Sequence, residues 1–240
     1  MGKHKVLGLV NPALGVSEMR CDDAIQKCIS TAFTRKQILA ATNREVDTSW
    51  LLAASSKYHL SSDIRDYVVA GVPVITSDFP NRNLQAMPKS EILSFNPRFG
   101  RPTYRTFVGK PTFQNHQNDD VTMAKGVNLD SIILSVPAYG IYKIIVLSAF
   151  DRTKDRDLAN GILKKERKFY SMGAWVDQFK CSICGANAAS VNCEHMKFGK
   201  GKVMKGKLVY QICQGIDYFE NSSVDDPADL TAVGDDVYSF

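Results

Sequence analysis

The feature that most constrains this sequence is an apolar, aromatic run at residues 168–176, KFYSMGAWV. Large side chains on both sides of a Ser-Met-Gly predict a buried strand with Ser171 at its centre. A serine hydroxyl is a weak nucleophile unless a neighbouring base accepts its proton. Any chemistry at Ser171 therefore depends on a partner from elsewhere in the chain.

The partner must come from four histidines. His4 lies in a basic N-terminal tip, His59 follows a run of apolar and small residues, and His195 belongs to a cysteine cluster. His116 follows a strand-like run and opens a polar turn, so it can reach a neighbouring strand. Taken alone, His116 is a solvated loop residue and Ser171 a small packing residue. Only their joint occurrence favours catalysis.

Hydropathy patterning predicts strands and helices in one domain spanning residues 1–240. A hydrophobic content of 44% with 10% aromatic residues suffices for a packed core and excludes a disordered chain. No repeat or linker divides the sequence. The pattern predicts a strand at 48–56 and one or two strands within 66–77, broken at Gly71 and Pro73. It also predicts strands at 131–139 and 141–150, as a hairpin or as two consecutive strands. It predicts helices at 17–42, 88–95 and 157–167. The acidic tail, 228–240, is expected to fray.

Charge and hydropathy limit the expected partners. The net charge is +5 and the isoelectric point about 8.8, but basic and acidic residues alternate along the chain. A solvated surface is therefore favoured over specific nucleic-acid binding. No apolar run approaches the ~20 residues that a membrane span needs, and the apolar run near the N-terminus is too short for a signal peptide. We expect a cytosolic protein.

Two blocks of sequence resemble one protein family when they are considered together. The first, at 104–126, reads Y-x-T-F-x-G-K-P, then N-H-x-N-x-D, then A-x-G. The second is an Asp-Arg, a helical stretch, then Y-S-M-G-A. The chain, over roughly residues 55 to 233, resembles the prohead proteases of tailed bacteriophages. These are serine endopeptidases distantly similar in fold to the herpesvirus capsid-assembly protease.

The resemblance implies roles for particular residues. Ser171 would be the nucleophile and His116 its general base. A third group should orient the imidazole, and the family's C-terminal block matches YFENSSVDDPADLTAV, which makes Glu220 the candidate. An extra asparagine and two aspartates depart from the usual pattern there. Asp225 and Asp226 therefore remain alternatives, as do Asp119 and Asp120 beside His116. Backbone N–H groups near Gly173 and Ala174 are candidate oxyanion donors.

The resemblance also implies a fold, partners and a location. The fold would be α+β, a β-barrel-like antiparallel or mixed sheet flanked by helices, with an N-terminal helical region at 1–50. The substrates would be scaffold or core proteins, the major capsid protein and the chain itself, cleaved inside the assembling procapsid in the host cytoplasm. A homo-oligomer is compatible with this, and catalysis would need no cofactor. The alternative is a non-catalytic, zinc-stabilised capsid assembly or scaffold-associated protein with the same fold.

A cysteine cluster directly follows the serine strand, within a probable insertion at 178–205. Cys181 and Cys184 form a C-x-x-C followed by glycine, and Cys193 and His195 come shortly after. Three cysteines and one histidine suit tetrahedral zinc, and four protein ligands leave no open position, so the zinc would be structural. A redox C-x-x-C and unconnected thiols are the alternatives. The chain has no H-E-x-x-H, which argues against a metallopeptidase. Cys213 is expected to be buried.

Overall fold

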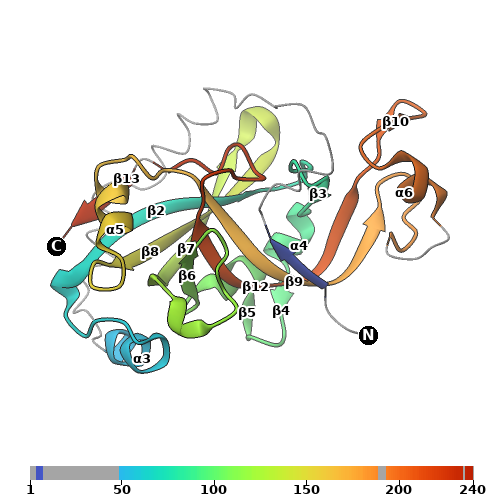
Figure 1. The fold of residues 1–240 in the computed structure, drawn as a ribbon. Helices are drawn as coiled ribbons and strands as arrows, with labels where there is room; N and C mark the ends of the chain where they lie inside the picture. Colours follow the sequence, from blue (N-terminus) through green and yellow to red (C-terminus); the bar gives the residue numbers. More distant parts are fainter. Residues whose placement is uncertain (1–3, 8–48, 189–192, 235, 240) are drawn as a thin grey trace.

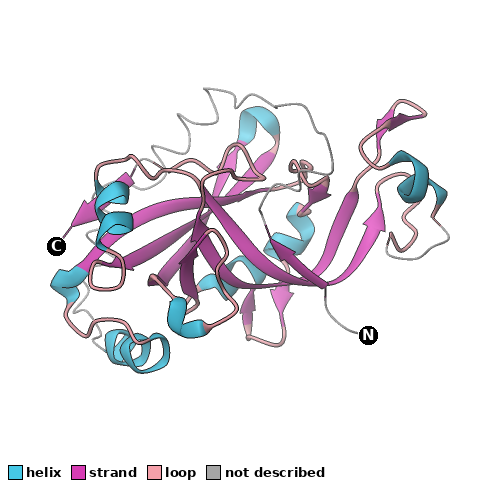
Figure 2. Cartoon of the chain, viewed as in Figure 1, coloured by secondary structure: helices cyan, strands magenta, loops and turns pink. Residues whose placement is uncertain are grey.

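A large mixed sheet dominates the fold (Figures 1 and 2). The structure is a computed structural model that describes residues 4–7, 49–188, 193–234 and 236–239. Its order is β1-β9-β12-β6-β7-β8-β2-β13, with β3 paired to β12. The pairings of β12 with β3 and β6 are parallel. The strands of this sheet are β1 (His4–Leu7), β2 (Tyr67–Thr76), β3 (Gln85–Ala86), β6 (Pro111–Gln114), β7 (Gly126–Val136), β8 (Ile141–Asp151), β9 (Tyr170–Cys181), β12 (Gln211–Ser223) and β13 (Asp236–Ser239).

Short helices and two small hairpins complete the described structure. None of the described helices is long and apolar enough to cross a membrane. The helices are α3 (Ser49–Tyr58), α4 (Lys89–Leu93), α5 (Arg156–Leu163) and α6 (Glu194–Gly199), with 3₁₀ turns η2 (Ile64–Asp66), η3 (Thr103–Phe107), η4 (Val121–Met123) and η5 (Pro137–Tyr139). The hairpins pair β4 (Phe95–Asn96) with β5 (Arg101–Pro102), and β10 (Val203–Met204) with β11 (Lys207–Leu208).

The fold is α+β as expected, but its sheet is not a closed barrel. Its end strands, β1 and β13, do not pair with each other. A single bridge, Phe169↔Val233, links the segment before β9 to the segment before β13. One bridge does not make a ladder, so the expectation of a barrel-like sheet is wrong for the described residues.

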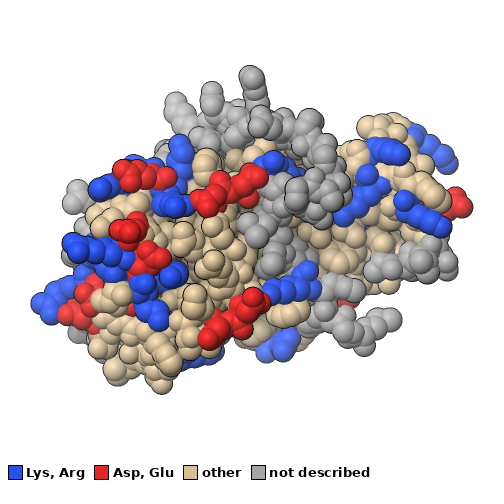
Figure 3. All heavy atoms as spheres, in the orientation of Figure 1, with Lys and Arg blue, Asp and Glu red and all other residues tan. Residues whose placement is uncertain are grey.

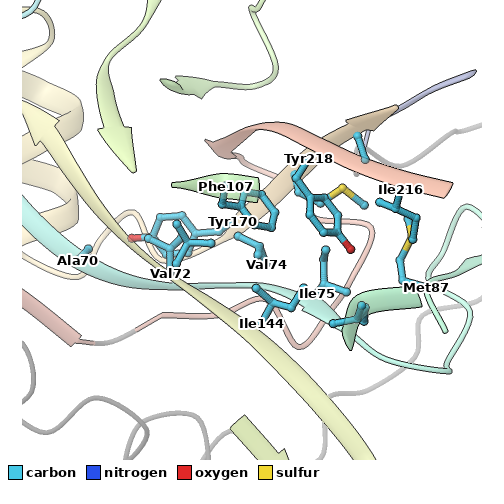
Figure 4. Packing of buried hydrophobic residues seen from close by; sticks show 14 of the residues in the cluster. Ala70, Val72, Val74, Ile75, Met87, Phe107, Ile144, Tyr170, Ile216 and Tyr218 are labelled. Carbon is cyan, nitrogen blue, oxygen red and sulfur yellow. The ribbon is translucent and has the colours of Figure 1, made fainter. Parts of the chain in front are cut away.

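The core lies on both faces of strand β2, which pairs with β8 and β13. Val68, Ala70, Val72 and Val74 enter one apolar cluster, whereas the alternate residues Tyr67 and Val69 enter a second. In the first cluster, side chains of β2 meet Tyr170 from β9 and Tyr218 from β12 (Figure 4). Phe107 stacks on Tyr218 with ring centroids 4.3 Å apart. Burial on both faces explains why the β2 sequence is almost continuously apolar.

The two strands predicted at 131–139 and 141–150 form a long hairpin. β7 and β8 pair antiparallel from Gly126↔Phe150 to Val136↔Ile141. The connection is η5 followed by Gly140, whose φ of 65° lies in the left-handed region that glycine adopts without a steric cost.

Two predictions of secondary structure fail. Residues 49–58 form helix α3 rather than a strand, because Leu51, Ala54 and Tyr58 recur at helical spacing and all pack into the second cluster. Leucine and alanine also favour helix over strand. The strand β2 continues through Gly71 and Pro73 without a break. Its register against β8 shifts between Pro73 and Ile75 instead, the irregularity expected where a proline cannot donate to the ladder.

The described residues of the C-terminal segment pair with the sheet, so the expectation of a frayed tail is wrong for them. Tyr170 N donates to Ala232 O, and Gly234 N donates to Lys168 O. β13 then pairs with residues 68–71 of β2.

The predicted helix at 17–42, and most of the proposed N-terminal helical region, lie outside the described residues.

The expected insertion forms a separate projection, which we call the metal lobe (residues 181–210). β9 and β12 run past the body of the sheet and carry α6, β10 and β11 at their far ends (Figure 1). The lobe therefore has little contact with the apolar core, so something other than core packing must order it.

Candidate functional site

His116 occupies a strained turn after β6. Asn115 and His116 have φ values of 47° and 55°, in the left-handed region that non-glycine residues rarely adopt. The Asn115 side chain exchanges two hydrogen bonds with Asp225, and Asn115 N donates to Ser223 O. These bonds tie the turn to the end of β12. Strain of this kind persists only where the surroundings impose it, and it often marks a functional site.

A bulge in β12 aims Glu220 at this turn. The pairing of β12 with β9 shifts between Tyr218↔Ala174 and Glu220↔Gly173. Without the extra residue, Glu220 would follow Tyr218 onto the core face, because side chains alternate along a strand. Glu220 instead lies on the opposite face, where its Oε1 is 2.7 Å from His116 Nδ1.

The histidine and the carboxylate form a buried pair. Their side chains are 1% and 0% exposed, and Ser222 Oγ donates to Glu220 Oε2 at 2.7 Å. Since Nδ1 is occupied by Glu220, Nε2 is the ring nitrogen left to exchange a proton with a reactant. His116 Nε2 is buried and has no hydrogen-bond partner. An unsatisfied buried group costs about 1–3 kcal/mol, so its retention calls for an explanation.

Ser171 lies on the same face as this pair. It is directly opposite Ser222 in the β9–β12 ladder, and Gly173 is directly opposite Glu220. Directly paired residues share a face of the sheet, with Cβ atoms roughly 5 Å apart. Ser171 is 4% exposed. His116 does not hydrogen-bond Ser171 in this conformation, because Nε2 has no partner.

Gly173 makes room for the carboxylate. A Cβ built on Gly173 would lie 2.3 Å from Glu220 Oε1 and 2.6 Å from Phe219 Cζ. Any other residue there would push Glu220 away from His116. The sequence argument gave Gly173 and Ala174 a different role, as oxyanion donors. Both residues pair with β12 on one side and β1 on the other, so their N–H groups face neighbouring strands, which argues against that role.

Among the residues that the structure describes, no strand pairs with this edge of β9 beside the serine. Pairing with β1 ends at Gly173, and the bridge to the C-terminal segment lies at Phe169. A cavity of about 240 Å³ adjoins this stretch. Its wall includes Ser171 and Met172, and its mouth carries two exposed aromatic residues, Phe79 and Tyr139. The other lining residues are Val74, Ile75, Thr76, Pro80, Asn81, Arg82, Gln85, Met87, Ile141, Ala228, Asp229, Leu230 and Thr231.

A buried ionic cluster that sequence reasoning missed anchors one wall of the cavity. Lys143 is fully buried, and its Nζ donates to Thr76, to Thr231 and, at 3.3 Å, to Asp229. Burial opposes ionisation of Asp229, but Lys143 and hydrogen bonds from both threonines outweigh it and hold the pKa of this carboxyl below its usual value. The cluster fixes residues 229–231 against β2 and β8. The sequence feature that could have indicated this cluster is a lysine within an otherwise apolar strand.

The other acidic candidates do not contact His116. Asp225 pairs with Arg167 as well as Asn115, and Asp226 pairs with Arg82. Asp120 caps η4 through a bond from Thr122 N, and Asp119 is exposed. Of the acidic residues that the sequence analysis named, Glu220 is therefore the one bonded to the imidazole.

The four predicted metal ligands come together in the metal lobe. The ligand atoms of Cys181, Cys184, Cys193 and His195 all lie within 4.8 Å of one another. Cys184 Sγ and Cys193 Sγ are 3.8 Å apart, about the separation of two thiolates at 2.3 Å from one tetrahedral ion. Three thiolates and an imidazole form a donor set that zinc prefers, so the residues fit the predicted ion.

The local backbone also suits a metal knuckle. Gly185 has a φ of 70°, and its N–H returns to Cys181 O. Burial raises the pKa of the Cys181 thiol, but N–H groups of Cys184 and Ile183 outweigh it and lower the pKa. Cys213, by contrast, is buried as expected, and burial raises its pKa to about 12.

Comparison with known proteins does not assign this site. No protein-family model, no curated protein and no solved structure matched the chain. The function must therefore be argued from the site's geometry and from the sequence resemblance.

Proposed function

We propose that this protein is a serine endopeptidase in which Ser171 is the nucleophile, His116 the general base and Glu220 the residue that orients the imidazole. The observation that carries the proposal is the buried His116–Glu220 pair on the same face of the sheet as Ser171. Burying an ionisable pair is costly, and a bulge, a strained turn and Gly173 are all required to assemble it. Stability alone does not call for such an arrangement.

In the proposed reaction, His116 Nε2 accepts the proton of Ser171 Oγ as that oxygen attacks the scissile carbonyl. The proton then passes to the leaving amine, and water releases the acyl group in a second, equivalent step. Glu220 bonds Nδ1, which stabilises the imidazolium and leaves Nε2 for the reactant. A movement of the turn at 115–118 must bring Nε2 to the serine, and catalytic hydrogen bonds are often long before substrate binds.

The cavity beside Ser171 is the proposed binding site for a substrate side chain. Most of its lining side chains are apolar, and its volume of about 240 Å³ is below the ~300–1,000 Å³ of sites for drug-sized ligands. It suits one bulky apolar side chain of a peptide. No described strand pairs with β9 next to the cavity, so this edge offers a pairing partner for that peptide's backbone. Substrate binding by an extended segment is consistent with a peptidase.

The sequence resemblance supplies the biological setting of the proposal. The substrates would be scaffold or core proteins, the major capsid protein and the enzyme itself, cleaved inside the assembling procapsid in the host cytoplasm. The metal of the lobe would be zinc, held by Cys181, Cys184, Cys193 and His195 in a structural role. When bound, zinc would cross-link the lobe and would take no part in peptide cleavage.

The non-catalytic alternative, a zinc-stabilised capsid assembly or scaffold-associated protein, is favoured by one observation. His116 Nε2 makes no hydrogen bond, so the geometry of an assembled catalytic triad is incomplete. Reactivity of Ser171 separates the two functions directly.

The test uses a fluorophosphonate probe and intact-mass spectrometry. We expect one adduct on Ser171 in the wild type and none in Ser171→Ala or His116→Ala, together with self-processing products in the wild type alone. In similar enzymes, loss of the nucleophile or base lowers kcat by about 10⁶-fold. Ser135→Ala, an exposed serine on β7, is the matched control and should behave as wild type. A folded wild type without an adduct would favour the non-catalytic function.

A further inference from the structure

Positive charge gathers on the metal lobe. Residues 181–210 contain five lysines, one acidic residue (Glu194) and no arginine, a net charge of +4, so the rest of the chain contributes only +1. In the face shown in Figure 3, basic side chains, which are lysines within the lobe, cluster there with almost no acidic side chain, whereas both signs are mixed over the body. The alternating charge of the whole chain conceals this segregation.

Most of these lysines are free to meet a partner. Lys197, Lys202, Lys205 and Lys207 are exposed. The fifth, Lys200, is half-buried and bonds Gln211, and burial lowers its pKa. The binding surface therefore offers four exposed ammonium groups, spread over α6, β10 and β11.

Exposed apolar side chains lie between the lysines along the chain. Phe198 is 63% exposed and Val203 is 70% exposed. Lys197 Nζ lies 5.1 Å from the centre of the Phe198 ring. Since α6 has only six residues, it cannot present the long apolar face with which an amphipathic helix enters a membrane. An exposed ring beside ammonium groups suits a base that stacks while its phosphates are neutralised.

We infer that the metal lobe binds single-stranded nucleic acid through its phosphate backbone, with Phe198 as a stacking platform. Lysine binds phosphate as a point charge, which requires no fixed geometry of the partner, and the exposed ring beside the ammonium groups favours a partner that also carries bases. Binding would be insensitive to base sequence, because lysine contacts to phosphate carry no sequence information. The inference does not depend on the reactivity of Ser171.

The experiment is fluorescence anisotropy of the metal-loaded, full-length protein with labelled oligonucleotides, dT20 and rU20, between 50 and 200 mM NaCl. Four phosphate contacts predict a slope of about −3 in log affinity against log salt, since each contact contributes about −0.7 for single strands. The triple variant Lys202→Glu, Lys205→Glu, Lys207→Glu should lose at least 10-fold in affinity for both oligonucleotides. Phe198→Ala should lose about 5-fold to 100-fold.

The matched control places the same charge change on the body, at the exposed residues Lys57, Lys164 and Lys168. It should retain affinity within about 2-fold. Metal content checks that each variant keeps its lobe, and a lysine-to-glutamine triple replaces the glutamate triple if that variant loses metal. No binding at 50 mM NaCl, or an equal loss in the body control, would overturn the inference. Displacement of dT20 by polyglutamate or by anionic vesicles as effectively as by unlabelled dT20 would also overturn it, in favour of an acidic protein or a membrane surface.

Discussion

Two regions at opposite ends of the same pair of strands are built in different ways. At one end of β9 and β12, the serine site combines groups that are 55 to 104 positions apart, from His116 to Ser171 and from His116 to Glu220. At the other end, the metal lobe gathers its four ligands within 15 residues. The serine site therefore depends on strand register and core packing, whereas the lobe's ligand cluster depends on local spacing and, in our proposal, on a zinc ion.

The difference predicts how each region fails. A sheet held by buried clusters on both faces should keep the serine site folded when the lobe is disrupted. The lobe's own buried side chains are few, so removal of its ion should unfold it locally. The predictions below test this separation, beginning with the largest effect.

Metal removal should unfold the lobe and spare the sheet. We expect about one equivalent of zinc in the purified protein, lost in Cys181→Ser with Cys184→Ser. Because structural zinc sites contribute roughly 10 kcal/mol to folding in small domains, amide exchange in residues 193–210 should become fast, while the β7–β8 hairpin stays protected. Inductively coupled plasma and exchange mass spectrometry provide the two measurements.

Cys213→Ala is the matched control for this experiment. Cys213 is fully buried in the apolar core and lies outside the ligand set, so the variant should lose stability and keep its metal. A metal-free protein whose lobe remains protected would show that the cysteine cluster does not order the lobe.

A single methyl group at Gly173 should damage the serine site specifically. Gly173→Ala places a Cβ 2.3 Å from Glu220 Oε1, so the carboxylate must leave His116 or the strands must shift. Overpacking of this kind costs about 1–3 kcal/mol. If Glu220 orients the base, labelling of Ser171 should slow by about 10-fold to 100-fold, while zinc content is unchanged.

Urea unfolding and probe-labelling rates measure the two effects. Gly185→Ala offers the reciprocal control, because Gly185 adopts a positive φ within the C-x-x-C turn and has no neighbour within 4 Å of a new Cβ. It should weaken metal retention and leave labelling of Ser171 intact. Equal labelling rates in Gly173→Ala and wild type would remove Glu220 from the proposed mechanism.

The same contrast explains what the sequence could and could not predict. The β9 strand, the two strands of the β7–β8 hairpin and the cysteine–histidine cluster are specified by local patterns, and all were predicted. The position of Glu220 depends on a bulge between Tyr218 and Glu220. The residues around Phe219 give no local sign of this bulge. The sequence resemblance identified Glu220, while periodicity alone would have placed it on the core face.

Local ambiguity and contacts between distant segments account for the remaining errors. The helix at 49–58 was missed although Leu51, Ala54 and Tyr58 have helical spacing, because a short apolar run is ambiguous between helix and strand. The partners of Lys143 could not be predicted, because Thr76 and Asp229 reach it from segments 67 and 86 positions away. Pairing of the C-terminal segment with β2 depends in the same way on the completed sheet.

The smallest predicted effect concerns the cavity wall at acidic pH. The folded-state pKa of Asp229 is below its usual value because Lys143, Thr231 and Thr76 outweigh the cost of burial. Ionised Asp229 therefore stabilises the fold above its unfolded-state pKa of about 3.9. That stabilisation is lost as the pH falls through the lower folded-state pKa, because the unfolded chain takes up the proton first.

Asp229→Asn removes this titration, so its urea stability should depend less on pH than that of the wild type below about pH 4, with the largest difference in stability near neutral pH. Asp226→Asn is the control, because Asp226 is exposed and pairs only at the surface with Arg82. If the two variants showed the same pH dependence, Lys143 and Asp229 would not anchor the cavity wall. If only Asp229→Asn flattened the profile, the body of the protein would contain a second ionic anchor, one that needs no metal because strands far apart in sequence hold it in place.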